Sequence, residues 1–573
     1  MEKLLTFFLL AFTLPSFNSC KQVVANDEDA AFEYRDIYLP GNSKDEGRLL
    51  GLHNLDRNWG IWGHNIGRIL PKDHSRSIYA TVEGRMNTDQ YCFSSEKLFQ
   101  YIVDFIDDKY DTNTTTRFAI LPNDNRIVCL CPDCIAKGCT YNDASPAVNS
   151  MIRRLAERFP QHIFFTSNYL TTRSVPTEPM PENTGVLISA IDYSLCAKAT
   201  TREEEMKALL NKWANVTSHM YVWDYICNFD DYFTPFPVFT VMQRRFQLYR
   251  DAGVSGLFLN GSGYDYSTFS RVKTRVLVAL MKDPDTDWVR ALKDACRELY
   301  PVAGDIIADY MQKQEHYVQT TAKMLPLYEG VNNSLRSHLA EQDFITFHDQ
   351  LRSILPRCNG DERKELSLMY RTMCLTRLEI MRIHANVQDA RPLLEQLQTV
   401  IEDGVKFYSE SYWSVENYIE DYRSMLTDAE EQRRHRQLVG KPLTALTALD
   451  PDYPDLSIVS DGLCGLPHNY HCGNLISSAD PWLRIAIPNA GELHNIRVSM
   501  VRNVQAHIGI PKLVKISVGD TELGKIVPPT IHEINGRSIV EFAIPFRTEG
   551  TLVLTIVRDK EERTMAIDEI TGW

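Results

Sequence analysis

The sequence lacks a long apolar run outside its N-terminus, and its charge is not of the sign that nucleic acids attract. Apart from residues 4–14, no stretch approaches the roughly 18 consecutive apolar residues of a transmembrane helix, so none is expected. Lys and Arg number 61 against 75 Asp and Glu, a net charge of −14, which argues against binding to nucleic-acid phosphates. With 44% apolar and 24% charged residues, the composition is globular, and neither disorder nor a fibrous repeat is expected.

Motifs of several enzyme classes are also missing. The chain has no phosphate-binding G-x-x-x-x-G-K loop, no clean G-x-G-x-x-G, no zinc-binding H-E-x-x-H and no G-x-S-x-G nucleophile elbow. No Lys stands at the end of a predicted strand, which speaks against Schiff-base chemistry. We therefore expect no cofactor and assign no metal to the site.

The N-terminus has the pattern of an export signal. Residues 4–14 form an apolar run of 11 residues after a short charged start, which suits a signal-peptide core and is too short to span a bilayer. Cys20 follows small and polar residues, as at a bacterial lipoprotein cleavage site. The pattern predicts a lipoprotein signal peptide over residues 1–20, a lipidated Cys20 that anchors the chain to a membrane, and an exported protein of the outer membrane or periplasm. Simple secretion is the alternative.

The 13 cysteines include one dense group. Cys129, Cys131, Cys134 and Cys139 are spaced C-x-C-x2-C-x4-C. Three interpretations are open: disulfides that pin a loop, which an exported compartment favours, a metal held by soft ligands, or free thiols.

Residues 31–282 alternate short apolar strands with amphipathic helices, which is typical of a parallel sheet. Helices are predicted after Ser145-Pro146, after the capping box that starts at Thr201, and over Val238–Ala252. Eight such units fit a closed (β/α)8 TIM-like barrel of α/β class. A distorted barrel is the alternative, because no clear helix is predicted between the first two strands. The predicted strands are Phe32–Leu39, Trp59–Ile66, Asp89–Phe93, Arg117–Pro122, His162–Tyr169, Val186–Tyr193, His219–Ile226 and Gly256–Asn260.

Two further regions follow the predicted barrel. Residues 283–440 keep helical spacing, with Leu366, Met369 and Met373 on one face, and predict a helical region. From residue 452 the apolar period changes to two, as in Trp482-Leu-Arg-Ile-Ala-Ile, with turn residues between such segments. Residues 452–573 are therefore predicted to form a β-sandwich.

The active site of such a barrel lies at the C-terminal ends of its strands. Asp124 and Asp224 are the predicted catalytic carboxylates, because glycoside hydrolysis uses a pair of acids. The other polar and aromatic side chains at strand ends are predicted to bind substrate: Trp62, His64, Asn65, Tyr91, Asn123, Tyr169, Asp192, Trp223, Asn228 and Asn260.

Structural roles are the alternatives for these residues. Asp124 after a strand can cap a turn, and Asp224 within Trp-Asp-Tyr can be a buried, hydrogen-bonded acid. His64 can be a satisfied core histidine, and Trp62 and Trp223 can belong to the core.

A series of motifs resembles the bacterial DUF4838 family, part of which is identified as glycoside hydrolase family 163. The motifs are Phe32-Glu-Tyr-Arg-Asp, Trp59-Gly-Ile-Trp-Gly-His-Asn, Pro122-Asn-Asp-Asn, Cys129-Leu-Cys-Pro-Asp-Cys, Trp223-Asp-Tyr-Ile-Cys-Asn and Phe236-Pro. Over roughly residues 31–320 the resemblance implies a (β/α)8 barrel with endo-β-N-acetylglucosaminidase activity on N-glycans. The tail from residue 455 more loosely resembles a galactose-binding-like sandwich.

Two positions depart from the pattern of the family. By analogy with hexosaminidase-like barrels, Asp124 is the acid/base or steers the acetamido group of the substrate, but Asn123 stands where the first acid of a pair is found. Asn260 stands where family members often have Glu. The first hypothesis is thus a lipid-anchored glycoside hydrolase acting on N-acetylglucosamine-containing glycans, with carbohydrate and no nucleic acid as partner. The second is a catalytically degenerate barrel that binds glycans.

Overall fold

The computed structural model describes residues 30–573 except 44, 111–112, 432–436, 479, 490, 505, 528–532, 535–536 and 560–563. The predicted signal peptide over residues 1–20, with its lipidation site Cys20, lies outside the described residues. Among the described helices, none combines the length and the apolar composition that a bilayer crossing requires.

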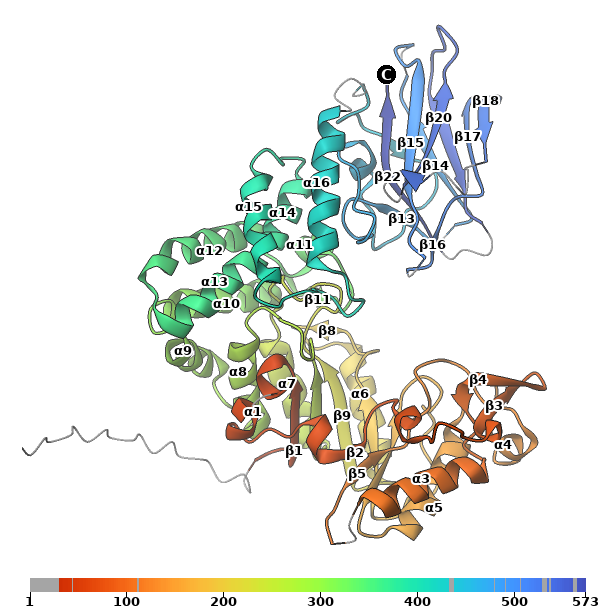
Figure 1. Ribbon diagram of the computed structural model, residues 1–573, viewed down its shortest axis with the longest axis vertical. Coiled ribbons are helices and arrows are strands. Elements are labelled where there is room, and N and C mark those ends of the chain that lie inside the picture. The colour runs from red at the N-terminus through yellow and green to blue at the C-terminus, as the bar shows by residue number, and fades with distance from the viewer. Residues whose placement is uncertain are drawn as a thin grey trace, which may run out of the picture.

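A parallel sheet of seven strands forms the centre of the N-terminal half, in the order β1-β10-β9-β7-β6-β5-β2 (Figure 1). Its strands are β1 (Tyr34–Tyr38), β2 (Trp59–Ile61), β5 (Arg117–Ala119), β6 (Ile163–Asn168), β7 (Thr184–Ser189), β9 (His219–Tyr225) and β10 (Gly256–Asn260). The helices that alternate with them are α3 (Glu96–Lys109), α5 (Ser145–Arg158), α6 (Thr201–Ala214), α7 (Phe239–Asp251) and α8 (Ser270–Lys282), with short α1 (Asp45–Leu49), α2 (Leu55–Asn58) and α4 (Pro132–Ala136) in the connections. This arrangement confirms the predicted α/β class.

The predicted third barrel strand, residues 89–93, does not join this sheet. The chain there forms β4 (Arg85–Tyr91), which pairs antiparallel with β3 (Tyr79–Val82) in a separate hairpin. From Arg85 to Asp89 the side chains are exposed or half-buried, whereas a central parallel strand is buried on both faces. The described strands therefore do not form the closed eight-stranded barrel, and β1 and β2 are the two ends of the sheet.

The two ends of the sheet nevertheless meet through side chains. Trp59 Nε1 on β2 donates a hydrogen bond to the Tyr34 hydroxyl on β1 across 2.8 Å. Inside the curved sheet the rings of Tyr34, Trp59, Phe165 and Tyr221 pack with centroids 4.7 to 6.2 Å apart. The sheet thus curls around an aromatic interior, and the carboxyl ends of its strands gather at one opening, which we call the mouth.

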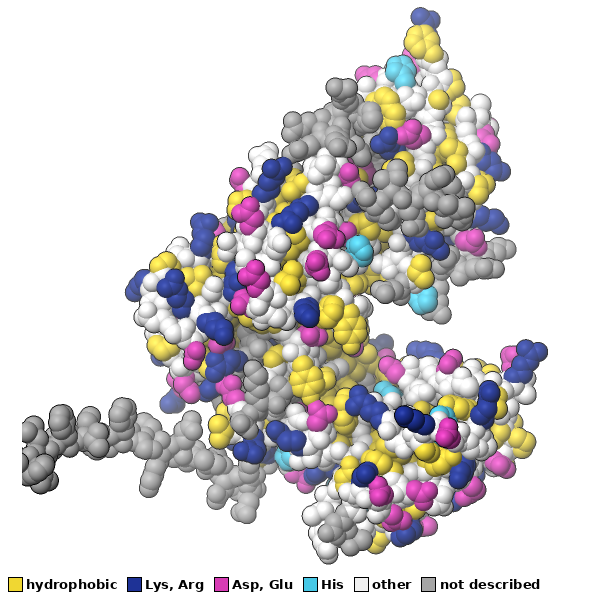
Figure 2. Space-filling view, viewed as in Figure 1, with side chains coloured by type: hydrophobic (Ala, Val, Ile, Leu, Met, Phe, Trp, Pro, Cys, Tyr) yellow, Lys and Arg dark blue, Asp and Glu magenta, His cyan; other side chains and the backbone are white. Residues whose placement is uncertain are grey.

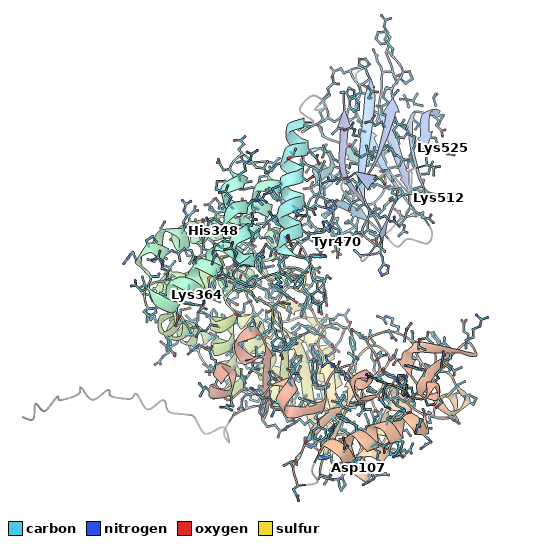
Figure 3. The ribbon with its side chains drawn as sticks, viewed as in Figure 1. Asp107, His348, Lys364, Tyr470, Lys512 and Lys525 are labelled. Atoms are coloured by element: carbon cyan, nitrogen blue, oxygen red, sulfur yellow. The ribbon has the colours of Figure 1, made fainter. Side chains whose placement is uncertain are left out.

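A helical region follows the sheet. It consists of α9 (Trp288–Leu299), α10 (Gly304–Thr321), α11 (Val331–Ser337), α12 (Glu341–Ile354), α13 (Gly360–Thr372), α14 (Cys374–Ile383), α15 (Ala390–Gln398) and α16 (Val415–Glu431). Strand β11 (Met324–Leu325) pairs with β8 (Leu195–Cys196) and so ties this region to the α/β part. His348 of α12 is packed inside the region, and burial lowers its pKa to about 4 (Figure 3).

Two antiparallel sheets form the C-terminal part of the chain, as the alternating period predicted. The first sheet contains β12 (Thr444–Ala445), β14 (Trp482–Ile487), β21 (Leu552–Val557), β17 (Leu513–Val518) and β18 (Thr521–Ile526). The second contains β13 (Leu475–Ser477), β22 (Thr564–Gly572), β15 (Asn495–Val501), β20 (Arg537–Ala543) and β19 (Glu533–Ile534), with β16 (Ile508–Gly509) beside β22. One apolar cluster with members on strands of both sheets forms the core of this part.

Buried polar contacts hold the sandwich to the rest of the molecule. His471 Nε2 lies 2.9 Å from a carboxylate oxygen of Asp230, and its Nδ1 lies 2.7 Å from the Tyr453 hydroxyl. Tyr470, labelled near the base of α16 in Figure 3, packs its ring at a tilt against that of His471, with the centroids 4.4 Å apart. The segment between β12 and β13 is thereby fixed against the loop that follows β9.

Candidate functional site

A pocket of about 160 Å³ opens at the mouth of the sheet. Most of its walls are strand ends of the parallel sheet, and the remainder comes from two side chains of the helical region. The lining residues are His64, Leu121, Asp124, Ser167, Tyr169, Leu187, Ser189, Ile191, Trp223, Tyr225, Asn260, Tyr328 and Glu410. Polar groups and aromatic rings thus share one concave surface.

A larger hollow adjoins this pocket. It measures about 460 Å³ and shares Ile191 and Tyr328 with the pocket, and it extends to Pro451 and Asp452 at the start of the sandwich. Figure 2 shows the surface of the molecule hollowed between the lobe that carries β3 and β4 and the C-terminal sandwich. The pocket is therefore continuous with space that suits an extended ligand.

Asp124 follows β5 and is exposed at the pocket, where Tyr169 hydrogen-bonds with it. Burial, and then the negative charge of Asp124, raise the pKa of Tyr169 to about 12, so the phenol stays protonated. His64 packs its ring 5.9 Å from that of Tyr169 and contacts the Pro122 carbonyl oxygen through Nδ1. Because a carbonyl only accepts, Nδ1 of His64 carries a proton.

The loop that carries Asp124 is fixed by the β3–β4 hairpin. Gln90, buried at the end of β4, accepts from the Asn123 backbone N–H at 2.9 Å and donates to the Asn123 carbonyl at 3.1 Å. The same amide donates to Asn125 Oδ1 at 3.0 Å, and Asn123 Nδ2 donates to the Asp89 carbonyl at 2.8 Å. The hairpin that replaces a barrel strand therefore sets the position of Asp124.

Glu410 is the second carboxylate of the pocket, and it comes from the loop between α15 and α16. Its backbone N–H donates to the Phe229 carbonyl at 2.7 Å, and the Tyr328 hydroxyl donates to its side chain at 3.2 Å. Partial burial raises the pKa of Glu410, although much of the residue is open to solvent. The Tyr328 hydrogen bond opposes this shift, and the charges of Asp230 and Asp124 add to it. Glu410 is thus shifted towards the protonated form beside another acid.

Asp224 lies on the opposite face of β9 from the pocket. Because side chains alternate along a strand, Trp223 and Tyr225 face the pocket and Asp224 faces α7. There it is fully buried, with Arg245 Nη1 2.5 Å from one carboxylate oxygen and the Tyr249 hydroxyl donating to the other at 2.7 Å. The structure corrects the prediction of a catalytic Asp224, which instead fastens α7 to the sheet.

The remaining predicted residues divide into those at the pocket and those away from it. Among the predicted set, the pocket is lined by Asp124, His64, Tyr169, Trp223 and Asn260. The others that were predicted to bind substrate are absent from the lining: Trp62, Asn65, Tyr91, Asn123, Asp192 and Asn228.

The contacts of these other residues explain their positions. Tyr91 stacks on Tyr79 within the hairpin, with ring centroids 6.0 Å apart. Asp192 is exposed and ion-paired with Arg173. Asn228 donates to the Glu329 carbonyl at 2.7 Å and is buried.

Asn65 and Trp62 lie beside the pocket without lining it. Asn65 Nδ2 donates to the Trp62 carbonyl at 2.8 Å, which closes a local turn. The Trp62 ring is half-buried, and the Arg68 guanidinium lies 5.6 Å from its centroid.

Five pocket residues with polar side chains were not predicted: Ser167, Ser189, Tyr225, Tyr328 and Glu410. Ser167, Ser189 and Tyr225 stand at strand ends, so the strand pattern carried a signal for them. Tyr328 and Glu410 lie in irregular segments of the helical region, and nothing in their local sequence indicates that they reach the mouth.

The fold and the site define an α/β protein with a polar, aromatic-walled pocket at the mouth of a curled parallel sheet. Residues 24–312 match the family described as "Domain of unknown function (DUF4838)", and the chain belongs to this family. No curated protein matches the chain.

Several solved structures of carbohydrate-active proteins are similar to this chain at low scores. A family GH115 4-O-methyl-α-glucuronidase with specificity for decorated arabinogalactans has 10% identity and a TM-score of 0.36, covering 84% of this chain and 68% of its own. A GH138 enzyme targeting pectin rhamnogalacturonan II has 8% identity and a TM-score of 0.30, covering 83% and 76%. The lectin domain of lectinolysin, in complex with Lewis B antigen, has 10% identity and a TM-score of 0.19, covering 24% and 95%. Likeness at scores this low says nothing about the activity of this chain, which has to be argued from its own pocket.

Proposed function

We propose that the protein is a glycoside hydrolase that uses Glu410 and Asp124 as its pair of carboxyl groups. The observation that carries the proposal is that both acids line one pocket, where the charge of Asp124 helps to raise the pKa of Glu410. An acid whose pKa is raised by its surroundings can divide the acid and base roles of glycoside hydrolysis with a second carboxyl group nearby. The earlier pair of Asp124 and Asp224 is replaced, since Asp224 is sealed behind the sheet.

In this proposal Glu410 protonates the leaving oxygen of the glycosidic bond. Asp124 acts on the sugar ring, either as base or by orienting an N-acetyl group that serves as nucleophile. The protonated phenol of Tyr169 holds the Asp124 carboxylate, and the ring of Trp223 supplies an apolar wall for the sugar. The adjoining hollow gives further sugar units a place to bind.

The substrate class in this proposal is an N-acetylglucosamine-containing glycan, after the resemblance to glycoside hydrolase family 163. The proposal also includes export and a lipid anchor at Cys20, which places the enzyme in the outer membrane or periplasm. Globomycin treatment tests the anchor, because an inhibited lipoprotein signal peptidase leaves the uncleaved precursor, whereas a simple secreted protein is processed normally.

Incubation with complex and high-mannose N-glycoproteins, followed by mass analysis of released glycans, tests the activity. The wild type is expected to release glycan, and Asp124→Asn is expected to lose this release by 100-fold or more, about the range for an acid–base group. Asp192→Asn is the matched control, because Asp192 is an exposed acid outside the pocket. Unchanged release by Asp124→Asn contradicts the proposed role.

A glycan-binding protein without hydrolytic activity is the second candidate. Asn260 favours it, since this amide lines the pocket at the end of β10, where family members often have Glu. No release from any glycan, together with glycan affinity that Trp223→Ala weakens, supports this candidate and contradicts the first.

A further inference from the structure

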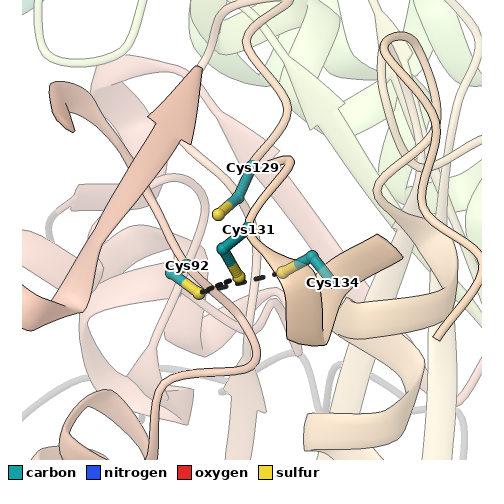
Figure 4. A group of neighbouring side chains, drawn as sticks. All are labelled: Cys92, Cys129, Cys131 and Cys134. Carbon is teal, nitrogen blue, oxygen red and sulfur yellow. Dashed lines mark hydrogen bonds between the residues drawn. The ribbon is translucent and has the colours of Figure 1, made fainter. Parts of the chain in front are cut away.

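Four cysteines from separate parts of the chain meet beside the β3–β4 hairpin. Cys92 follows β4, Cys129 and Cys131 lie in the loop before α4, and Cys134 lies within α4. Their sulfur atoms all lie within 4.8 Å of one another, and the side chains point towards a common centre (Figure 4). Three of the four are buried, and Cys131 is half-buried. The structure thus brings in Cys92, which the sequence pattern did not include, in place of Cys139.

The separations of Cys92 Sγ from two other sulfurs match a tetrahedral metal site and not a disulfide. Cys92 Sγ lies 3.7 Å from Cys131 Sγ and 3.8 Å from Cys134 Sγ. A disulfide requires about 2.05 Å between its sulfurs. Four thiolates around Zn²⁺ at about 2.3 Å, in tetrahedral geometry, stand about 3.8 Å apart.

Groups around the cluster suit thiolate ligands. The Thr81 backbone N–H donates to Cys129 Sγ at 3.2 Å, and the Ser94 Oγ lies 3.2 Å from Cys134 Sγ. Hydrogen bonds of this kind orient metal ligands and offset the negative charge of their sulfurs.

We propose that Cys92, Cys129, Cys131 and Cys134 bind one structural zinc ion as four thiolates. Binding displaces the thiol protons to solvent and leaves no open coordination position, so the ion has no catalytic role. The site fastens the hairpin to the loop that follows β5. Since Gln90 of the same hairpin holds Asn123, the ion also fixes the backbone beside Asp124.

Metal analysis of the purified protein tests this proposal without any enzymatic assay. The reduced protein, given one equivalent of Zn²⁺ and dialysed, is expected to retain about one zinc per chain by plasma mass spectrometry. Cobalt in place of zinc is expected to give the intense thiolate charge-transfer and visible bands of a tetrahedral sulfur site. Peptide mapping without reductant is expected to recover these four cysteines as thiols.

Paired variants identify the ligands. Cys131→Ser, at the half-buried position, is expected to lose the metal, whereas Cys139→Ser is expected to keep it, because Cys139 is buried nearby but lies outside the cluster. Disulfides among the four cysteines in the native protein overturn the proposal, as does failure of the reduced wild type to retain zinc and to show the cobalt bands. Loss of metal in Cys139→Ser with retention in Cys131→Ser overturns the ligand set.

Discussion

Glu410 and Asp124 reach the pocket from distant parts of the chain, and their surroundings differ. Partial burial and the neighbouring charges of Asp230 and Asp124 raise the pKa of Glu410 and favour its protonated form, against the opposing effect of the Tyr328 hydrogen bond. Asp124 stands beside a phenol that stays protonated and can donate to it. Two carboxyl groups with different surroundings are therefore available together in one pocket.

The pH dependence of kcat/KM tests the acid role proposed for Glu410. Since the pKa of Glu410 is raised, the active protonated form persists to higher pH than for an ordinary Glu, and the rate is expected to fall as pH rises through that pKa. In Glu410→Gln this basic limb is expected to disappear, with activity on natural glycans lower by about 10²- to 10⁴-fold. A profile of unchanged shape in the variant contradicts the assignment.

Asp224 shows where residue-level prediction from the sequence fails and why. Its position near the end of a strand suggested the site, but Trp223 and Tyr225 on either side are large aromatic residues that both turn towards the pocket. Strand alternation then places Asp224 on the face of the helices. Asp124, His64 and Asn260 reach the pocket because they end or follow strands, and the carboxyl ends of these strands lie at the mouth.

Asp224→Asn is expected to destabilise the fold by about 3–5 kcal/mol, because it leaves the buried Arg245 without its charged partner. Urea unfolding measures this loss. Asp251→Asn is the control, since Asp251 is an exposed partner of Arg250 and surface pairs contribute about 1 kcal/mol or less. Equal stabilities of the two variants contradict the structural role of Asp224.

At the scale of elements, β1 carries a buried acid, Asp36, close to where the side chains of β1 and β2 meet. Asp36 on β1 is 1% exposed and accepts hydrogen bonds from the Tyr34 hydroxyl at 2.9 Å and from Asn42 Nδ2 at 2.8 Å. Burial raises the pKa of Asp36 to about 7, although these hydrogen bonds lower it in part. The folded protein therefore holds a proton that the unfolded chain releases at much lower pH.

Stability is expected to fall as pH rises from about 4 to about 7 through Asp36, because unfolding releases its proton in that window. The contribution approaches about 1.4 kcal/mol per pH unit. Asp36→Asn is expected to remove this contribution, so that the difference in unfolding free energy between wild type and variant changes with pH. Chemical denaturation at pH 5 and pH 8 measures it, and parallel pH dependences of the two proteins contradict it.

The alternation of apolar segments and helices in the sequence predicted most strands of the sheet, but not that the third predicted strand lies outside it. Seven of the predicted strands appear in the sheet because each is a short, mostly apolar segment bounded by turns or helices. The prediction of a barrel strand at residues 89–93 was wrong because only the last residues of this segment are apolar. The polar stretch before them suits a hairpin in contact with solvent. A pairing between distant segments, such as Cys92 with Cys131, leaves no local sequence signal.

At the scale of the whole molecule, one face of the pocket depends on how the helical region is held. The loops that carry Tyr328 and Glu410 lie near the contact between Asp230 and His471, which joins the sheet to the sandwich. The spacing of apolar residues predicted a helical region and a sandwich. How these parts pack against the sheet is set by individual side-chain contacts, such as that between Asp230 and His471. The sequence therefore does not predict that Glu410, from a loop of the helical region, lines the pocket.

Asp230→Asn is expected to loosen the sandwich, because His471 and Asp230 are both buried and pair at 2.9 Å. Calorimetry is expected to show a lower first transition, and a wider separation between transitions, than in wild type. Asp285→Asn, which alters an exposed ion pair with Arg250, is the control and is expected to leave the trace unchanged. Identical traces for Asp230→Asn and wild type contradict this linkage.

The kinetics of single and double carboxyl variants test the central claim most directly. If Asp124 and Glu410 act in one reaction, Asp124→Asn and Glu410→Gln each lower kcat/KM for glycan release strongly, and the double variant loses little beyond the worse single variant. Asp192→Asn stays near wild type. Release at the wild-type rate by either single variant, with folding intact by circular dichroism, would show that this pocket is not where the glycosidic bond is broken.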